Sequence, residues 1–122
     1  MTKLTRKQAL EMSLEKWIWH YENPELSLGS ADFPKIKNGE WPEMRSHCPC
    51  CEYVKQYHWP ITQTICKNYC PINWPIGRCT PESRYIKPQK ESYFYHWTNA
   101  ITSKMRKKYA KLIVDLIKKE LE

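Results

Sequence analysis

The chain has 122 residues, and its composition is that of one basic domain unusually rich in cysteine, tryptophan and tyrosine. Twenty lysine and arginine residues against thirteen acidic ones give a net charge of +7, which favours anionic partners without choosing among them. No apolar run approaches the roughly 20 residues of a membrane span, and charges interrupt every apolar stretch near the N-terminus, which argues against a signal peptide. We therefore expect a cytoplasmic protein without a membrane partner.

Residues 5–22 are predicted to form a helix with one apolar face. Thr5 and Gln8 match the capping box, in which the hydroxyl accepts a free backbone N–H and the amide reaches back to the cap. Apolar side chains then recur at steps of three and four residues: Leu10, Leu14, Trp17, Ile18 and Tyr21. The helix should end at Asn23, because the following Pro24 disfavours helical geometry in the residue before it.

The middle of the chain, residues 23–88, is expected to contain little regular structure. Residues 23–47 are predicted to be a loop, with at most a short hairpin turn at Asn38-Gly39. Residues 48–88 hold all six cysteines and six of the nine prolines. Proline forbids long helices and central strands, so only one short helix after Cys51 is expected there.

Residues 90–121 are predicted to return to helix, with a break near residue 100 where polar side chains gather. An apolar stripe runs through Tyr93, Trp97, Ile101, Met105, Tyr109, Leu112, Ile113, Leu116 and Leu121. Neither this stripe nor that of residues 5–22 should face water alone, so the two terminal helices are expected to share one core within a single domain.

The cysteine pattern predicts a structural zinc site. Cys48 and Cys51 form a CxxC pair, in which one tight turn brings two thiolates within about 2.3 Å of the same ion. Cys66 and Cys70 form a second, wider pair, and Cys79 is a fifth candidate. Thiols stay reduced in the cytosol, which favours a metal over disulfides. We expect four of these five thiolates to bind the ion, and the spacing does not decide between Cys70 and Cys79 as the fourth ligand.

Other interpretations of the same residues stay open. A reduced cluster without metal, late disulfides or an iron–sulfur cluster would use the same thiols. Cys50 is expected to stand outside the site, because neighbouring residues do not easily point at one ion, and His47 is a weaker ligand candidate. His20 and Glu22 form the HxE of a zinc-dependent deaminase, but that signature has proline before its CxxC, where this chain has His47. We therefore expect a protein that is not an enzyme, with a zinc-dependent deaminase, nuclease or other hydrolase as the catalytic alternative.

Five short motifs follow one another along the chain: "ALEMSLEKW" at 9–17, the pair Cys48 and Cys51, "CKNYCP" at 66–71, Cys79, and "SYFYHW" at 92–97. Their order resembles that of a group of small, cysteine-rich phage-encoded accessory proteins of unknown function. This chain departs from them in the three residues between Cys66 and Cys70 and in its additional Cys50. The resemblance implies a viral accessory protein in the host cytoplasm and supplies no catalytic residues.

Two sets of side chains are candidates for binding a partner. Lysines lie along one side of the last predicted helix: Lys104, Lys107, Lys108 and Lys111. Most such runs of lysines are simply solvated surface. If this one has a function, we expect it to bind nucleic acid, a nucleotide or an acidic protein. Trp59 and Trp74, close to the cysteines in sequence, suit base stacking or a protein hot spot.

These observations predict a mainly α protein whose terminal helices pack together, with an irregular, proline-rich, zinc-stapled lobe between them. The expected function is binding without catalysis, as a phage anti-defence factor that inhibits a host protein. The alternative is a module that binds nucleic acid or a nucleotide, including a sponge for a signalling nucleotide. The oligomeric state is not predicted.

Overall fold

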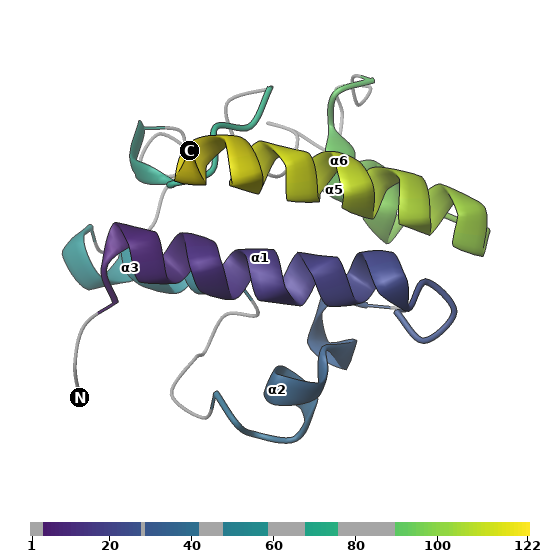
Figure 1. Cartoon of the computed structure of the whole chain (residues 1–122), viewed down its shortest axis with the longest axis horizontal. Coiled ribbons are helices and arrows are strands. Elements are labelled where there is room, and N and C mark those ends of the chain that lie inside the picture. The colour runs from purple at the N-terminus through teal and green to yellow at the C-terminus, as the bar shows by residue number, and fades with distance from the viewer. Residues whose placement is uncertain (1–3, 28, 42–47, 59–67, 76–89) are drawn as a thin grey trace.

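The computed structural model describes residues 4–27, 29–41, 48–58, 68–75 and 90–122 (Figure 1). Its elements are α1 (Arg6–Glu22), the 3-10 helix η1 (Ser30–Asp32), α2 (Pro34–Lys37), α3 (Pro49–Tyr57), α5 (Tyr93–Thr98) and α6 (Ser103–Leu121). No strand occurs in these ranges, so the predicted mainly helical class is confirmed for them. None of the described helices is long and apolar enough to cross a membrane.

The first helix begins as its sequence predicts. Thr5 Oγ1 accepts the backbone N–H of Gln8 at 3.1 Å, and Gln8 Oε1 accepts that of Thr5 at 2.9 Å, which completes the capping box. At the other end Asn23 is the C-cap, and its side-chain amide donates to the carbonyl of Trp19 at 3.0 Å. The boundaries of α1 therefore follow from local signals alone.

Helix α6 lies antiparallel along α1 (Figure 1). At one end Arg6 forms an ion pair with Glu120 at 2.9 Å, and at the other the ammonium of Lys107 lies 4.8 Å from the centre of the Tyr21 ring. The terminal helices share one core, as predicted. Its buried members include Ala9, Leu10, Trp17, Trp97, Ala110, Ile113, Val114 and Ile117.

The buried stripe of α6 differs from the predicted one. The fully buried residues are Ala110, Ile113, Val114 and Ile117, whereas the predicted Tyr109, Leu112 and Leu116 are partly buried at its edge. Helix α6 contacts α5 as well as α1, so the burial is centred between the two neighbours. The prediction was wrong for Met105, which is 40 % exposed, and for Ile101, which is 86 % exposed because it lies between the two helices.

The predicted break near residue 100 is confirmed. Helix α5 ends at Thr98, and α6 starts after Thr102, whose hydroxyl accepts the backbone N–H of Met105 at 3.1 Å. The break lets α5 fold back on α6, where His96 stacks on Tyr109 with ring centres 5.2 Å apart.

The segment after α1 holds short helices in place of the hairpin suggested at Asn38-Gly39. Pro34 opens α2, where its fixed φ suits the first helical turn, and Ile36 is helical. Gly39 has a φ of +76°, which terminates α2 in a conformation that glycine adopts without strain. In the next segment, the short helix predicted after Cys51 forms but begins earlier, at Pro49.

Helix α1 buries a second face that its apolar pattern did not reveal. Ala9, Ser13, Lys16 and His20, which follow one another at steps of four, three and four residues, are all buried. Helix α1 contacts α3 as well as α6, so it is covered on two sides (Figure 1). We call Ser13, Lys16 and His20 the polar stripe of α1.

Candidate metal centre

The start of α3 carries three cysteines to the polar stripe of α1. Cys48 is the N-cap of α3, and Cys50 and Cys51 lie in its first turn behind Pro49. The side chain of Cys50 is fully buried, with its Sγ 3.2 Å from Ser13 Oγ and 3.9 Å from the carbonyl oxygen of Ala9. Contact between α3 and α1 thus turns the cysteine run toward the core.

Four thiols form one connected cluster. Cys48 lies near Cys50 and Cys51, and Cys50 lies near Cys70, close enough for each to affect the pKa of its neighbour. We call these four residues the thiol cluster. Cys70 is held nearby because Ile72 and Trp74, just after it, are buried in the core. Cys50 lies between Cys48 and Cys70 in this cluster, and its exclusion from the metal ligands stays a prediction.

The contacts within the thiol cluster push the pKa values of its members apart. Hydrogen bonds from Cys50 and Cys51 hold the pKa of the Cys48 thiol well below its ordinary value, with a smaller contribution from the charge of Lys16. The hydrogen bond from Cys50 also lowers the pKa of Cys70. The same contacts, to Cys48 and then Cys70, raise the pKa of Cys50. Cys48 and Cys70 therefore lose their protons more readily than an ordinary thiol, and Cys50, which lies between them, holds its proton more tightly.

A buried cation faces these sulfurs. Lys16 is only 1 % exposed, and its ammonium lies 4.3 Å from the centre of the Trp17 ring. Burial lowers the pKa of Lys16 to about 8, and the charges of Cys48, Cys51 and Cys50 oppose that effect. A lysine is almost never fully buried unless it is paired, so its position marks the thiol cluster as a site of negative charge.

The structure describes part of the predicted ligand set. It brings Cys48, Cys51 and Cys70 into the thiol cluster, whereas Cys66 and Cys79 lie outside the described residues, as do His47 and Trp59. Within the described part of the chain, no group of three or more histidine, cysteine or acidic side chains that could hold a metal ion is found. No disulfide joins any two of the four described thiols.

The HxE residues lie in different environments. His20 is buried, where its Nδ1 is 2.5 Å from Ser27 Oγ and its ring contacts Trp17 and Trp97 at centre distances of 4.9 and 4.8 Å. Glu22, two residues later, is exposed. The described geometry therefore places the histidine in the aromatic core and its partner carboxylate at the surface.

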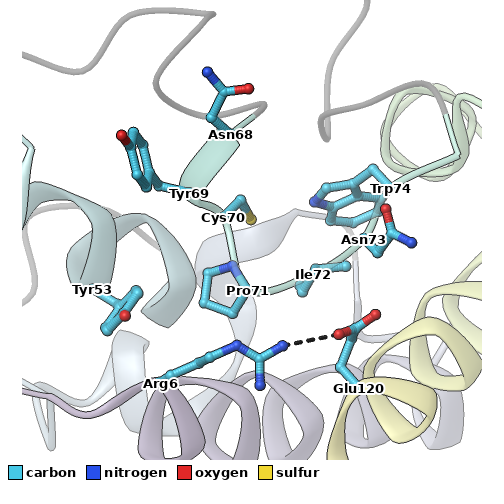
Figure 2. Close-up of a pocket in the computed structure, with 10 residues that line it drawn as sticks. All are labelled: Arg6, Tyr53, Asn68, Tyr69, Cys70, Pro71, Ile72, Asn73, Trp74 and Glu120. Carbon is cyan, nitrogen blue, oxygen red and sulfur yellow. Dashed lines mark hydrogen bonds and ion pairs between the residues drawn. The ribbon is translucent and has the colours of Figure 1, made fainter.

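A polar pocket of about 570 Å³ opens beside the thiol cluster (Figure 2). The ion pair of Arg6 and Glu120 lies on one side of it, and Cys70 and Trp74 line another. Trp74 is 5 % exposed, so little of its ring is accessible to a partner.

The four predicted lysines of α6 are all exposed: Lys104, Lys107, Lys108 and Lys111. Some already have local partners. Lys111 forms an ion pair with Asp115 at 2.6 Å, and the ammonium of Lys108 lies 5.4 Å from the centre of the Tyr109 ring.

Comparison of the chain with family models, with curated proteins and with solved structures gives no significant match. Its function therefore has to be inferred from its own residues.

The sequence contained one unused signal for this site. Ser13, Lys16 and His20 have helical spacing on one face, and such a run normally indicates a solvated surface. The cysteines that cover this face are distant in sequence, so the pattern alone does not show that it is buried.

Proposed function

We propose that the chain is a small zinc-stabilised binding protein without catalytic activity. Four of the cysteines Cys48, Cys51, Cys66, Cys70 and Cys79 bind one structural zinc ion. The observation that carries this proposal is the burial of Lys16 against the thiol cluster. A buried ammonium is costly unless an anion faces it, and zinc fixes its cysteine ligands as thiolates.

The charges support a centre of this kind. Four thiolates around Zn²⁺ carry a net charge of about −2, and one lysine reduces that charge within the low-dielectric core. The proline-rich lobe needs such a centre, since ligand binding and folding are coupled in small zinc domains. Zinc would act here as a staple between the lobe and α1.

Elemental analysis of protein purified under reducing conditions tests the metal. We expect one zinc per chain, and we expect Cys48→Ser to lose it together with the structure of the lobe. Cys50→Ser is the matched control and should retain zinc, whereas loss of zinc in this variant would add Cys50 to the ligands. A metal-free wild-type protein whose melting temperature is unchanged by a chelator would refute the proposal.

We further propose that the binding target is a host protein, which the resemblance to phage accessory proteins favours. The lysines of α6 offer an exposed basic surface, but its charge is reduced where Lys111 is paired with Asp115. A nucleic-acid site depends on many free cations that replace the counterions of phosphates, so partial neutralisation of this surface favours a protein over a nucleic acid.

Salt dependence distinguishes the two targets. A nucleic acid should bind with an affinity that falls steeply with salt and is lost when Lys104, Lys107, Lys108 and Lys111 are changed to Glu. A protein target should lose on-rate with salt while much of its affinity remains. Tight, salt-sensitive binding to plain DNA or RNA would refute the proposal of a protein target.

A further inference from the structure

An exposed apolar knob projects from the junction of α5 and α6. Ile101 is 86 % exposed, and Met105, one turn into α6, is 40 % exposed. Lys104 and Lys108, also exposed, lie beside them on the same end of the helix. We call these four residues the basic knob. From Glu91 to Asp115 the intervening chain contains no acidic residue, so the charge around the knob has one sign.

The knob is held in place by Arg106. Its guanidinium donates to the carbonyl of Ala100 at 3.2 Å, to Ser103 Oγ at 3.4 Å and to the carbonyl of Pro24 at 2.9 Å. These bonds tie the residues on both sides of Ile101 to the turn that follows α1. The isoleucine is therefore presented to solvent by a fixed backbone, and binding would require little ordering of this segment.

A groove of about 500 Å³ on another part of the surface has the complementary character. Leu14, Ile18, Trp19 and Phe33 form its apolar lining, and Glu11, Glu15 and Glu22 also line it. The three glutamates are exposed and border the apolar lining, with Glu11 and Glu15 each in a surface ion pair with a lysine. We call this feature the acidic groove.

The acidic groove lies on the side of α1 away from the thiol cluster. At 3.6 residues per turn, Leu14 and Ile18 point roughly opposite to the polar stripe of Ser13, Lys16 and His20. The groove is bordered by Phe33, which precedes α2 and contacts the ring of Trp19 at a centre distance of 6.0 Å. It is therefore a surface that the zinc proposal does not use.

We propose that the acidic groove of one chain binds the basic knob of a second copy. Ile101 and Met105 would enter the apolar lining, and Lys104 and Lys108 would meet the glutamates around it. This occupant follows from charge complementarity, because one chain carries both an apolar knob among lysines and an apolar groove among glutamates. The existing ion pairs of Glu11 with Lys7 at 3.7 Å and of Glu15 with Lys35 at 2.5 Å are exposed and exchangeable.

A two-fold arrangement satisfies both sites at once. Each chain of a symmetric dimer would place its knob in the groove of the other, so the contact occurs twice and the assembly closes. Each contact would involve only a few side chains, so the interface should be small and the dimer reversible.

Sedimentation velocity on a concentration series of the reduced wild-type protein tests the proposal. We expect a monomer–dimer equilibrium, and we expect Ile101→Glu to weaken dimerisation about tenfold or more, as loss of a central anchor does. Because Ile101 is almost fully exposed, its replacement should leave the circular dichroism spectrum and the melting temperature unchanged. A wild-type protein that stays monomeric throughout, or a variant that dimerises as well as wild type, would overturn the proposal.

Charge exchange between knob and groove gives a sharper test. Lys104→Glu with Lys108→Glu reverses the knob, and Glu11→Lys with Glu15→Lys reverses the groove. Each double variant alone should be monomeric, since like charges then meet, and an equimolar mixture should form a heterodimer with both contacts restored. Lys118→Glu with Lys119→Glu, at the far end of α6, is the matched control and should dimerise as wild type does.

The mixing experiment also removes a trivial explanation. A variant that had merely unfolded would not regain association when mixed with its counterpart. Failure of the mixture to associate would overturn the proposal, as would equal loss of dimerisation in the control variant. The zinc content of all these proteins should be unchanged, so failure here is distinguishable from failure of the metal proposal.

Discussion

Replacing Lys16 with methionine should change stability in opposite directions with and without zinc. Methionine keeps most of the length and the apolar character of the side chain and removes the charged ammonium with its hydrogen-bond donors. In the metal-free protein, burial lowers the pKa of Lys16 from 10.5 to about 8. A difference of about 2.5 at 1.36 kcal/mol per pKa unit corresponds to about 3 kcal/mol of unfavourable free energy for the charged form at pH 7.

The sign follows from linkage. Between pH 8 and 10.5 the unfolded chain binds more protons at Lys16 than the folded chain does, so this group makes the folded state more stable as the pH rises. Below pH 8 Lys16 is charged in the folded state, and the full free-energy cost of burying its charge is present. Lys16→Met should therefore stabilise the metal-free protein at pH 7 by up to about 3 kcal/mol.

With zinc bound, the sulfurs are fixed as anions and the lysine is their counter-charge. Removing one partner of a buried ionic contact typically costs about 3–5 kcal/mol, so the zinc-loaded variant should be less stable than the zinc-loaded wild type. Urea unfolding at pH 7 under reducing conditions, with and without a chelator, measures both differences. Lys7→Met is the matched control, since its side chain is 80 % exposed, and it should change stability by less than about 0.5 kcal/mol.

If Lys16→Met stabilises the protein in both conditions, the thiol cluster is not anionic. That result would remove the main support for zinc. An unchanged stability in both conditions would mean that the lysine reaches solvent in solution, contrary to its 1 % exposure.

Four further substitutions test the core, the cap and the cluster, each by urea unfolding. Ile113→Ala should cost about 2–5 kcal/mol because Ile113 is fully buried, and Leu116→Ala, at the edge of the stripe, should cost less; the reverse order would contradict the observed face of α6. Thr5→Ala should cost about 1 kcal/mol through loss of the capping box, and no loss would mean that the first turn is frayed in solution. Cys50→Ala should cost on the order of 1 kcal/mol, since it removes a buried sulfur from Ser13 but no proposed ligand; complete unfolding would show a larger role.

Features set by neighbouring residues could be predicted from the sequence. The capping box at Thr5, the break before Ser103 and the pairing of the terminal helices all follow from short-range signals or from periodicity. Each of these depends on only a few dihedral angles or on a stripe that must avoid water. These predictions are confirmed because no contact made elsewhere in the described fold opposes the local signal.

Features that depend on which elements meet could not be predicted in the same way. Ile101 matches the helical step from Trp97, but the break removes it from the helix and leaves it in solvent. Cys50 was set aside on local geometry, and contact between α3 and α1 places it between two other thiols. In both cases the position of the residue along the chain is clear from the sequence, but the element that packs against it is not.

The polar stripe of α1 suggests how the cysteine lobe obtains a defined position. Ser13 contacts Cys50, Lys16 faces Cys48 and Cys51, and His20 contacts Ser27. An apolar face would accept many arrangements of a covering segment at similar energy, because hydrophobic burial has no direction. By contrast, burying a hydroxyl, an ammonium or an imidazole costs free energy unless each is paired with its own partner. The polar stripe therefore stabilises the fold less than leucines would in the same positions. However, any register of α3 in which the thiols do not face the lysine leaves a buried polar group without its partner and costs free energy. Such selectivity would suit the proposed zinc site, because its cysteine ligands have to converge on one ion.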